Sequence, residues 1–171
     1  RLPWHVHRDA PPWITSPDLM AAIQDNIPHN HCYGCGPDNP DGMQIKSYWD
    51  GKESTCTYMP RPEQCAGPQQ YLYGGTIASL IDCHCVGTAI ANYYQRDGLE
   101  IGEGPPIWCV TGGLKVNYVK PTAIDQPVDL RATIAECTDS KTVVNCTLSS
   151  SGIVTAEGEV IAIRVPGSWR E

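Results

Sequence analysis

The segment from Thr76 to about Gln95 contains the longest apolar stretch of the chain, and it constrains the fold more than any other feature. Its apolar side chains fall on nearly every face of a helix, which is typical of a buried helix. Asp82 and His84 lie in the middle of the stretch. Charge at that depth argues against a membrane span, so we expect the central helix of a globular domain. Because a buried carboxylate is costly unless something satisfies it, Asp82 is a candidate functional residue.

Strand patterns stand on both sides of this helix. Two short runs precede it and four longer runs follow, and turn formers separate them. The predicted strands are Met43–Trp49, Ser54–Met59, Trp108–Val119, Val128–Cys137, Thr142–Ser149 and Val154–Arg164. This order predicts an α+β fold in which one curved antiparallel sheet wraps around the long central helix.

The chain ahead of the first strand divides into an arm, a short helix and a loop. Ser16-Pro17-Asp18 is typical of a helix start, so we expect a helix from about Pro17 to Gln24 after an irregular arm. Turn formers then fill residues 29–42. We therefore assign residues 1–30 to an N-terminal arm with a short helix, and residues 31–171 to a single domain.

Composition limits the classes of protein to which the chain can belong. Hydrophobic residues make up 41% and charged residues 18%, a balance typical of a globular domain. The net charge of −7 argues against nucleic-acid binding. The nine cysteines are odd in number and show no repeated spacing, so we expect reduced, mostly buried thiols. The N-terminal segment lacks the apolar run of a signal peptide, and we expect a cytoplasmic protein, with any segment ahead of Arg1 left open.

Three further segments carry a family resemblance. They are CYGCGPDNPDGM at residues 32–43, Tyr73-Gly74-Gly75 followed by Ser79-Leu80-Ile81-Asp82, and LKVNYVKP at residues 114–121. In this order they resemble the PaaI-like acyl-CoA thioesterases of the hotdog superfamily, over roughly residues 32–164. The resemblance implies a hotdog fold, a homodimer or homotetramer, and hydrolysis of an acyl-CoA or acyl-carrier thioester without a metal or cofactor.

The resemblance also implies roles at the helix. Asp82 is expected to act as nucleophile or general base, facing the helix start of a second chain, where the backbone N–H of Gly74 binds the oxyanion. Helix starts have free N–H groups, and Gly74 and Gly75 have no Cβ, so a thioester can approach closely. Many relatives carry His at the position of Tyr73. A phenol has an unperturbed pKa near 10, so we expect Tyr73 to shape the site rather than to transfer protons.

Substrate contacts are predicted on the strand after the helix. Glycine in mid-strand marks a bulge or a close approach of ligand, and Thr111-Gly112-Gly113 fits either interpretation. Asn117 is a further polar candidate there. For the phosphates of CoA the first candidate is Arg61. Weaker candidates are Lys115, Lys120, Arg131 and Lys141.

Alternatives stay open at several positions. His29, His31, Cys32 and Cys35 have the spacing of a zinc site, although the resemblance accounts for these cysteines without metal. Asp82 can instead be a buried structural residue, and His84 is expected to be structural. A non-catalytic acyl-CoA-binding or scaffold protein is the main rival function. A hotdog hydratase or dehydratase is a weaker rival, because it would need His where Tyr73 stands.

Overall fold

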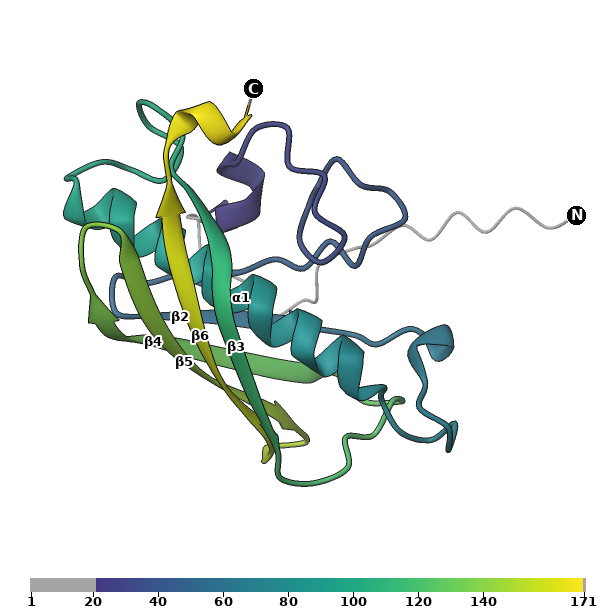
Figure 1. Cartoon of the computed structure of the whole chain (residues 1–171). Coiled ribbons are helices and arrows are strands. Elements are labelled where there is room, and N and C mark those ends of the chain that lie inside the picture. Colours follow the sequence, from purple (N-terminus) through teal and green to yellow (C-terminus); the bar gives the residue numbers. More distant parts are fainter. Residues whose placement is uncertain (1–20, 171) are drawn as a thin grey trace, which may run out of the picture.

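The structure, a computed structural model, describes residues 21–170 and contains one long helix against a strongly bent sheet (Figure 1). The sheet has six strands in the order β1-β2-β4-β5-β6-β3, and every neighbouring pair is antiparallel. The elements are β1 (Tyr48–Trp49), β2 (Glu53–Tyr58), α1 (Gly74–Arg96), β3 (Trp108–Tyr118), β4 (Val128–Cys137), β5 (Lys141–Ser150), β6 (Ile153–Val165) and the short 3-10 helices η1 (Ile23–Asn26), η2 (Pro62–Gln64) and η3 (Gly167–Arg170). The predicted α+β architecture is confirmed.

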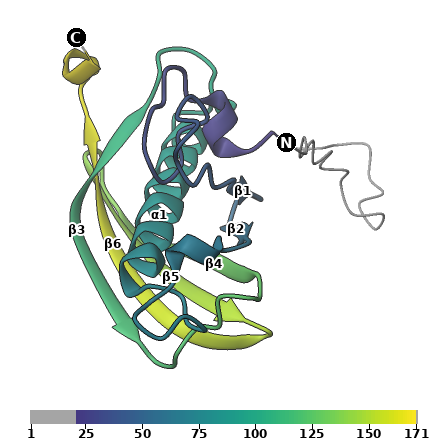
Figure 2. The same ribbon diagram turned by 90° about the vertical axis from the view of Figure 1, so that its right-hand side faces the viewer.

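Helix α1 lies in the concave side of the sheet, and Figure 2 shows the strands curving around it. Leu80, Ile81 and Cys85 are fully buried. Within residues 21–170, α1 is the one helix long and apolar enough to cross a membrane by length and composition, yet 67% of its most apolar window is buried inside the protein. Its apolar surface is therefore used by the core of the domain.

The inner face of the sheet follows from the alternation of side chains along each strand. In β5 the buried residues Thr142, Val144, Cys146 and Leu148 alternate with more accessible ones. Successive side chains of a strand point to opposite faces, so one face packs on α1 and the other meets solvent. Gly158 in β6 lets the sheet approach α1 closely, because a Cβ at this position would collide with Cγ2 of Ile81 on the helix.

Strand β3 forms one edge of the sheet and corresponds to the strand predicted over Trp108–Val119. Its pairing with β6 shifts register between Thr111 and Gly113, which is a β-bulge. A Cβ at Gly112 would lie 2.7 Å from Cγ1 of Ile163, so glycine is needed for this close packing. The bulge interpretation of these glycines is thus confirmed, and their contact with substrate stays a prediction.

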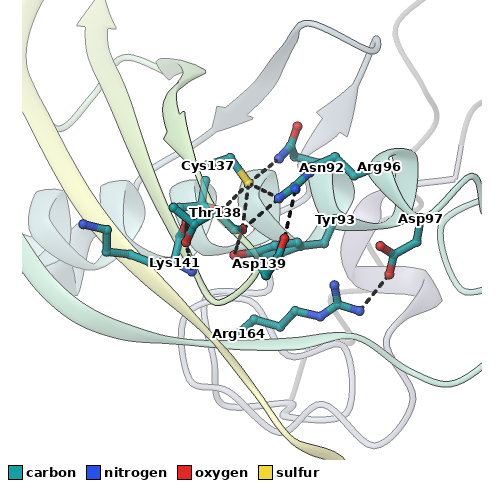
Figure 3. A network of polar contacts seen from close by, with 10 residues as sticks. Asn92, Tyr93, Arg96, Asp97, Cys137, Thr138, Asp139, Lys141 and Arg164 are labelled. Carbon is teal, nitrogen blue, oxygen red and sulfur yellow. Dashed lines mark hydrogen bonds and ion pairs between the residues drawn. The ribbon is translucent and has the colours of Figure 1, made fainter.

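Polar contacts fix the C-terminal end of α1 to the turn between β4 and β5 (Figure 3). Arg96 donates from Nη1 to the carbonyl oxygen of Thr138 at 2.8 Å. Tyr93 donates its hydroxyl to the same oxygen at 3.1 Å. Arg164 lies over the Tyr93 ring, 4.9 Å from its centroid, and pairs with Asp97 at 2.7 Å. These contacts set the direction of the helix relative to the sheet.

The N-terminal predictions were less accurate. The strand expected over Met43–Trp49 is reduced to β1, because its first residues pair with the preceding loop: the N–H of Met43 donates to the carbonyl of Tyr33 at 2.7 Å. The arm of residues 1–16 and the first four residues of the helix expected over Pro17–Gln24 lie outside the described residues. The described part contains η1, a 3-10 turn that begins only at Ile23.

His84 is enclosed in the core, as expected for a structural residue. Its Nδ1 lies 2.8 Å from the hydroxyl of Ser47, and its Nε2 lies 3.3 Å from the hydroxyl of Ser54. Burial lowers the pKa of His84 to about 4 from an ordinary value of 6.5. The folded protein therefore holds a neutral imidazole at neutral pH.

This burial predicts a pH dependence of stability. Between pH 6.5 and about 4 the unfolded chain binds a proton at His84 that the folded chain does not, so stability is full above pH 6.5 and falls as the pH falls. In this pH range His84 lowers the free energy of unfolding by roughly 1.4 kcal/mol for each pH unit of acidification. Denaturant unfolding from pH 7 to 5 should show this slope, and His84→Asn should flatten it. An unchanged slope in His84→Asn, with the exposed His31→Asn as control, would contradict the assignment.

Candidate active site

Asp82 projects from α1 toward the bulge of β3. Thr111, at the bulge, donates its hydroxyl to Oδ1 of Asp82 at 2.6 Å. Burial raises the pKa of Asp82, the hydrogen bond from Thr111 lowers it, and the nearby Cys32 raises it further, with a net upward shift. The side chain is half-buried, so this carboxyl group is partly desolvated while it stays accessible. Asp82 and Thr111, which the sequence analysis selected separately, thus lie together.

The helix start forms a second cluster. Tyr73 caps α1 without a side-chain hydrogen bond, and its ring folds back over Gly75, where a Cβ would collide with it. Tyr118 from β3 donates its hydroxyl to the carbonyl of Gly74 at 2.7 Å. Both tyrosines are exposed, at 57% and 53%. The sequence analysis missed Tyr118, although the strand segment that carried the resemblance contains it.

A groove of about 440 Å³ opens at this helix start. Tyr73 and Gly75 line it together with Arg61, and Tyr33 and Met43 of the preceding loop form another part of its wall. Nε of Arg61 is buried and makes no hydrogen bond, although it lies 3.5 Å from a carboxylate oxygen of Glu63. The guanidinium is therefore placed beside the groove with hydrogen-bonding capacity left over.

The structure does not bring all predicted site residues together. Asp82 follows Gly74 by eight residues, which is about 12 Å along a helix axis. Asn117 lies next to Tyr118 on β3, so the two side chains point to opposite faces of the sheet. Asn117 lines a different groove, of about 840 Å³, together with Lys115 and Arg131. Within one chain the predicted site residues thus form two groups, one around Asp82 and one around the helix start. Asn117 belongs to neither group.

Three cysteines form a separate cluster beside Asp82. The Cys32 and Cys83 sulfur atoms are 3.7 Å apart, and both lie within 4.8 Å of the sulfur of Cys35. Hydrogen bonds from Cys35 and Cys83 lower the pKa of Cys32, and the same contacts raise the pKa of each donor. The sequence analysis weighed Cys32 and Cys35 as zinc ligands with His29 and His31. Among residues 21–170 the group that can hold a metal contains Cys83 and neither histidine.

Comparisons with known proteins agree with this fold. Residues 69–157 match the family model described as Thioesterase superfamily. A thioesterase superfamily protein from Shewanella loihica is 33% identical, covers 81% of this chain and 96% of its own, and superposes with a TM-score of 0.60. No curated protein sequence matches the chain significantly.

Two more distant structures show the same fold. The E. coli PaaI protein from the phenylacetic acid degradation operon is 14% identical, covers 73% of this chain and 82% of its own, and has a TM-score of 0.60. A Streptococcus mutans protein, solved with acetyl-CoA bound, is 15% identical, with coverages of 71% and 88% and a TM-score of 0.58. At these identities the similarity shows the hotdog fold alone.

The two close glycine contacts predict opposite effects on stability. At Gly158 an added Cβ meets Ile81, which is fully buried and cannot move, so Gly158→Ala should destabilise the fold by roughly 1–3 kcal/mol. At Gly75 the added Cβ meets the exposed ring of Tyr73, which can rotate away, and alanine is the better helix former. Thermal unfolding should therefore show a lower midpoint for Gly158→Ala and an unchanged or higher one for Gly75→Ala. Equal losses in both variants would mean that Gly75 serves the fold rather than the site.

Proposed function

Because the chain belongs to the thioesterase superfamily, we propose that it hydrolyses an acyl-CoA or acyl-carrier thioester to a carboxylic acid and a free thiol. The observation that carries this proposal is the half-buried carboxyl of Asp82, held by Thr111 at a bulge of an edge strand. The acetyl-CoA bound to the Streptococcus mutans structure supports a CoA thioester as the substrate class.

Asp82 is assigned the chemical step, as nucleophile or as general base to a water molecule. Thr111 holds one carboxylate oxygen, which leaves the other for the thioester carbonyl or the water. A carboxylate whose pKa is raised by burial is a stronger base toward the attacking water. The scheme uses no metal or cofactor in the chemical step.

The oxyanion is assigned to the start of a second copy of α1. Reacting groups must lie about 3–3.5 Å apart, but Asp82 and the helix start of its own chain are separated by about two turns, or 12 Å. A site that combines Asp82 with the N–H of Gly74 therefore needs two chains. We propose a homodimer, or a homotetramer built from such dimers, with the long β3 edges paired across the interface.

Tyr73 and Arg61 are proposed to bind rather than to react. The Tyr73 ring can wall the acyl group in the groove, and its hydroxyl can donate to the oxyanion. Arg61 has a buried Nε with free hydrogen-bonding capacity on the same groove, which suits a phosphate of CoA. Gly112 and Gly113 have no side chain at the bulge beside Asp82, so we propose that the substrate approaches the backbone there. Asn117 stays a weaker proposal, because it lines the other groove.

Two further points belong to the proposal. All nine cysteines are free thiols, which suits a reducing compartment, so we keep a cytoplasmic location.

The ring of Tyr73, folded over the helix start, favours a binding protein without hydrolysis as the second candidate function. Steady-state turnover of the wild-type protein with acyl-CoAs of several chain lengths separates the two, because a binding protein would show affinity without hydrolysis.

Asp82→Asn should lower turnover by about 100- to 10,000-fold, because it keeps the size of the side chain and removes the base or nucleophile. Circular dichroism and the melting temperature should stay close to those of the wild type. The control is Asp125→Asn, the same change at an exposed position. Tyr73→Phe should cost less, roughly 10- to 1,000-fold if its hydroxyl supports the oxyanion. A folded Asp82→Asn protein with near wild-type turnover would refute the assignment of Asp82.

A further inference from the structure

Cysteines from two distant segments meet beside α1. Cys32 and Cys35 lie in the loop of residues 29–42, which Figure 2 shows in dark blue next to the helix, and Cys83 lies on α1 itself. Their three sulfur atoms lie within 4.8 Å of one another. We propose that Cys32, Cys35 and Cys83 bind a zinc ion, which fastens the loop to α1. This inference is independent of the proposed function, because it assigns the metal no part in hydrolysis.

The distances between the sulfur atoms fit a tetrahedral metal. Zinc–sulfur bonds of about 2.3 Å at tetrahedral angles place two sulfur ligands about 3.8 Å apart. The sulfur atoms of Cys32 and Cys83 are 3.7 Å apart. A disulfide would need about 2.05 Å, so the two are not a bonded pair. The separation of Cys32 and Cys83 is thus that of two ligands of one zinc ion, and Cys35 lies close enough to be the third.

The loop backbone is built to present the first two thiols. Cys32-Tyr33-Gly34-Cys35-Gly36 has the two-residue spacing of paired zinc ligands. The N–H of Gly36 donates to the carbonyl of Cys32 at 2.8 Å, which closes a tight turn around both cysteines. A Cβ at Gly36 would collide with the backbone of Asn30, and a Cβ at Gly34 would collide with the sulfur of Cys83. Gly36 is therefore required by the folding of the loop on itself, and Gly34 by the approach of the turn to the helix.

A cation explains why three thiols meet here. Cys56, Cys83 and Cys109 all belong to the apolar core, where a thiol serves as a small hydrophobic side chain, but among these three only Cys83 belongs to the group of three close sulfur atoms. Three thiols in mutual contact gain only weak hydrogen bonds, and ionising more than one of them brings like charges together. A zinc ion allows all three to bind as thiolates. Because Cys32 is exposed, water can reach the cluster, and we assign the fourth coordination position to a water molecule.

The position of the metal gives it a structural consequence. The loop that it would fasten also supplies Tyr33 and Met43 to the wall of the groove at the helix start. Backbone hydrogen bonds hold the loop to the segment that follows it, such as the bond from the N–H of Ile45 to the carbonyl of Gly34 at 3.1 Å. A bound zinc would add a link directly to the helix, and it would revise our sequence-based expectation of a metal-free loop.

Elemental analysis of the full chain, purified under reducing conditions after growth with added zinc, tests this proposal. We expect about one zinc per chain in the wild type, and background levels in Cys32→Ala and Cys83→Ala. Cys65→Ala is the matched control, because Cys65 is half-buried like Cys35 but lies outside the cluster, and it should keep the zinc. Cobalt(II) added to the metal-free wild type should give sulfur-to-cobalt charge-transfer absorption, a measurement that does not depend on the variants folding.

Two results would overturn the proposal. One is a wild-type protein with substoichiometric zinc and no cobalt–thiolate absorption, which would leave three packed thiols. The other is a disulfide among these cysteines in the protein purified under reducing conditions, seen by mass spectrometry after alkylation, which would make the cluster a redox pair. Neither result bears on Asp82, whose role is tested by turnover. Conversely, a zinc-loaded protein without hydrolytic activity would refute the proposed function and leave the metal site standing.

Discussion

The packing of α1 into the concave face of the sheet is the contact on which the rest of the structure depends. Nearly all faces of the helix are apolar, so it is stable only when strands surround it, and the sheet must bend to do so. Gly158 shows how tight the fit is, because β6 leaves no room for a Cβ against Ile81. Every polar group on α1 must therefore find a partner inside this enclosure or reach its edge.

The two ionisable residues in the middle of α1 meet this requirement in different ways. His84 is fully enclosed and lies between Ser47 and Ser54, so it is held neutral and serves the core. Asp82 points instead to the edge strand, where the bulge at Thr111 offers it one hydrogen bond and partial exposure. A carboxyl group that is desolvated but accessible suits chemistry, whereas a fully satisfied histidine suits stability. The fold thus places a fully buried histidine and a partly exposed carboxyl group only two residues apart on the same helix.

Much of this arrangement was predictable from local patterns. The apolar run indicated a buried helix, and alternating runs separated by turn formers indicated the strands from β2 to β6, because both signals depend only on periodicity. The strand expected over Met43–Trp49 was too long, because its first residues pair with the loop at Tyr33 and Gly34 and only its last two residues join the sheet. The meeting of Cys83 with Cys32 was not predictable. The two are 51 residues apart, and only the path of the loop over the helix brings them together.

The central claim is that Asp82 of one chain works with the helix start of another, and subunit mixing tests it most directly. Asp82→Asn chains and Gly75→Val chains, each expected to be inactive alone, would be unfolded and refolded together in equal amounts. Half of the dimers are then mixed, and each of these contains one site with both groups intact, so about one quarter of wild-type turnover should return. If each site lay within a single chain, the mixture would stay as inactive as its parents, and the account of a shared site would be wrong.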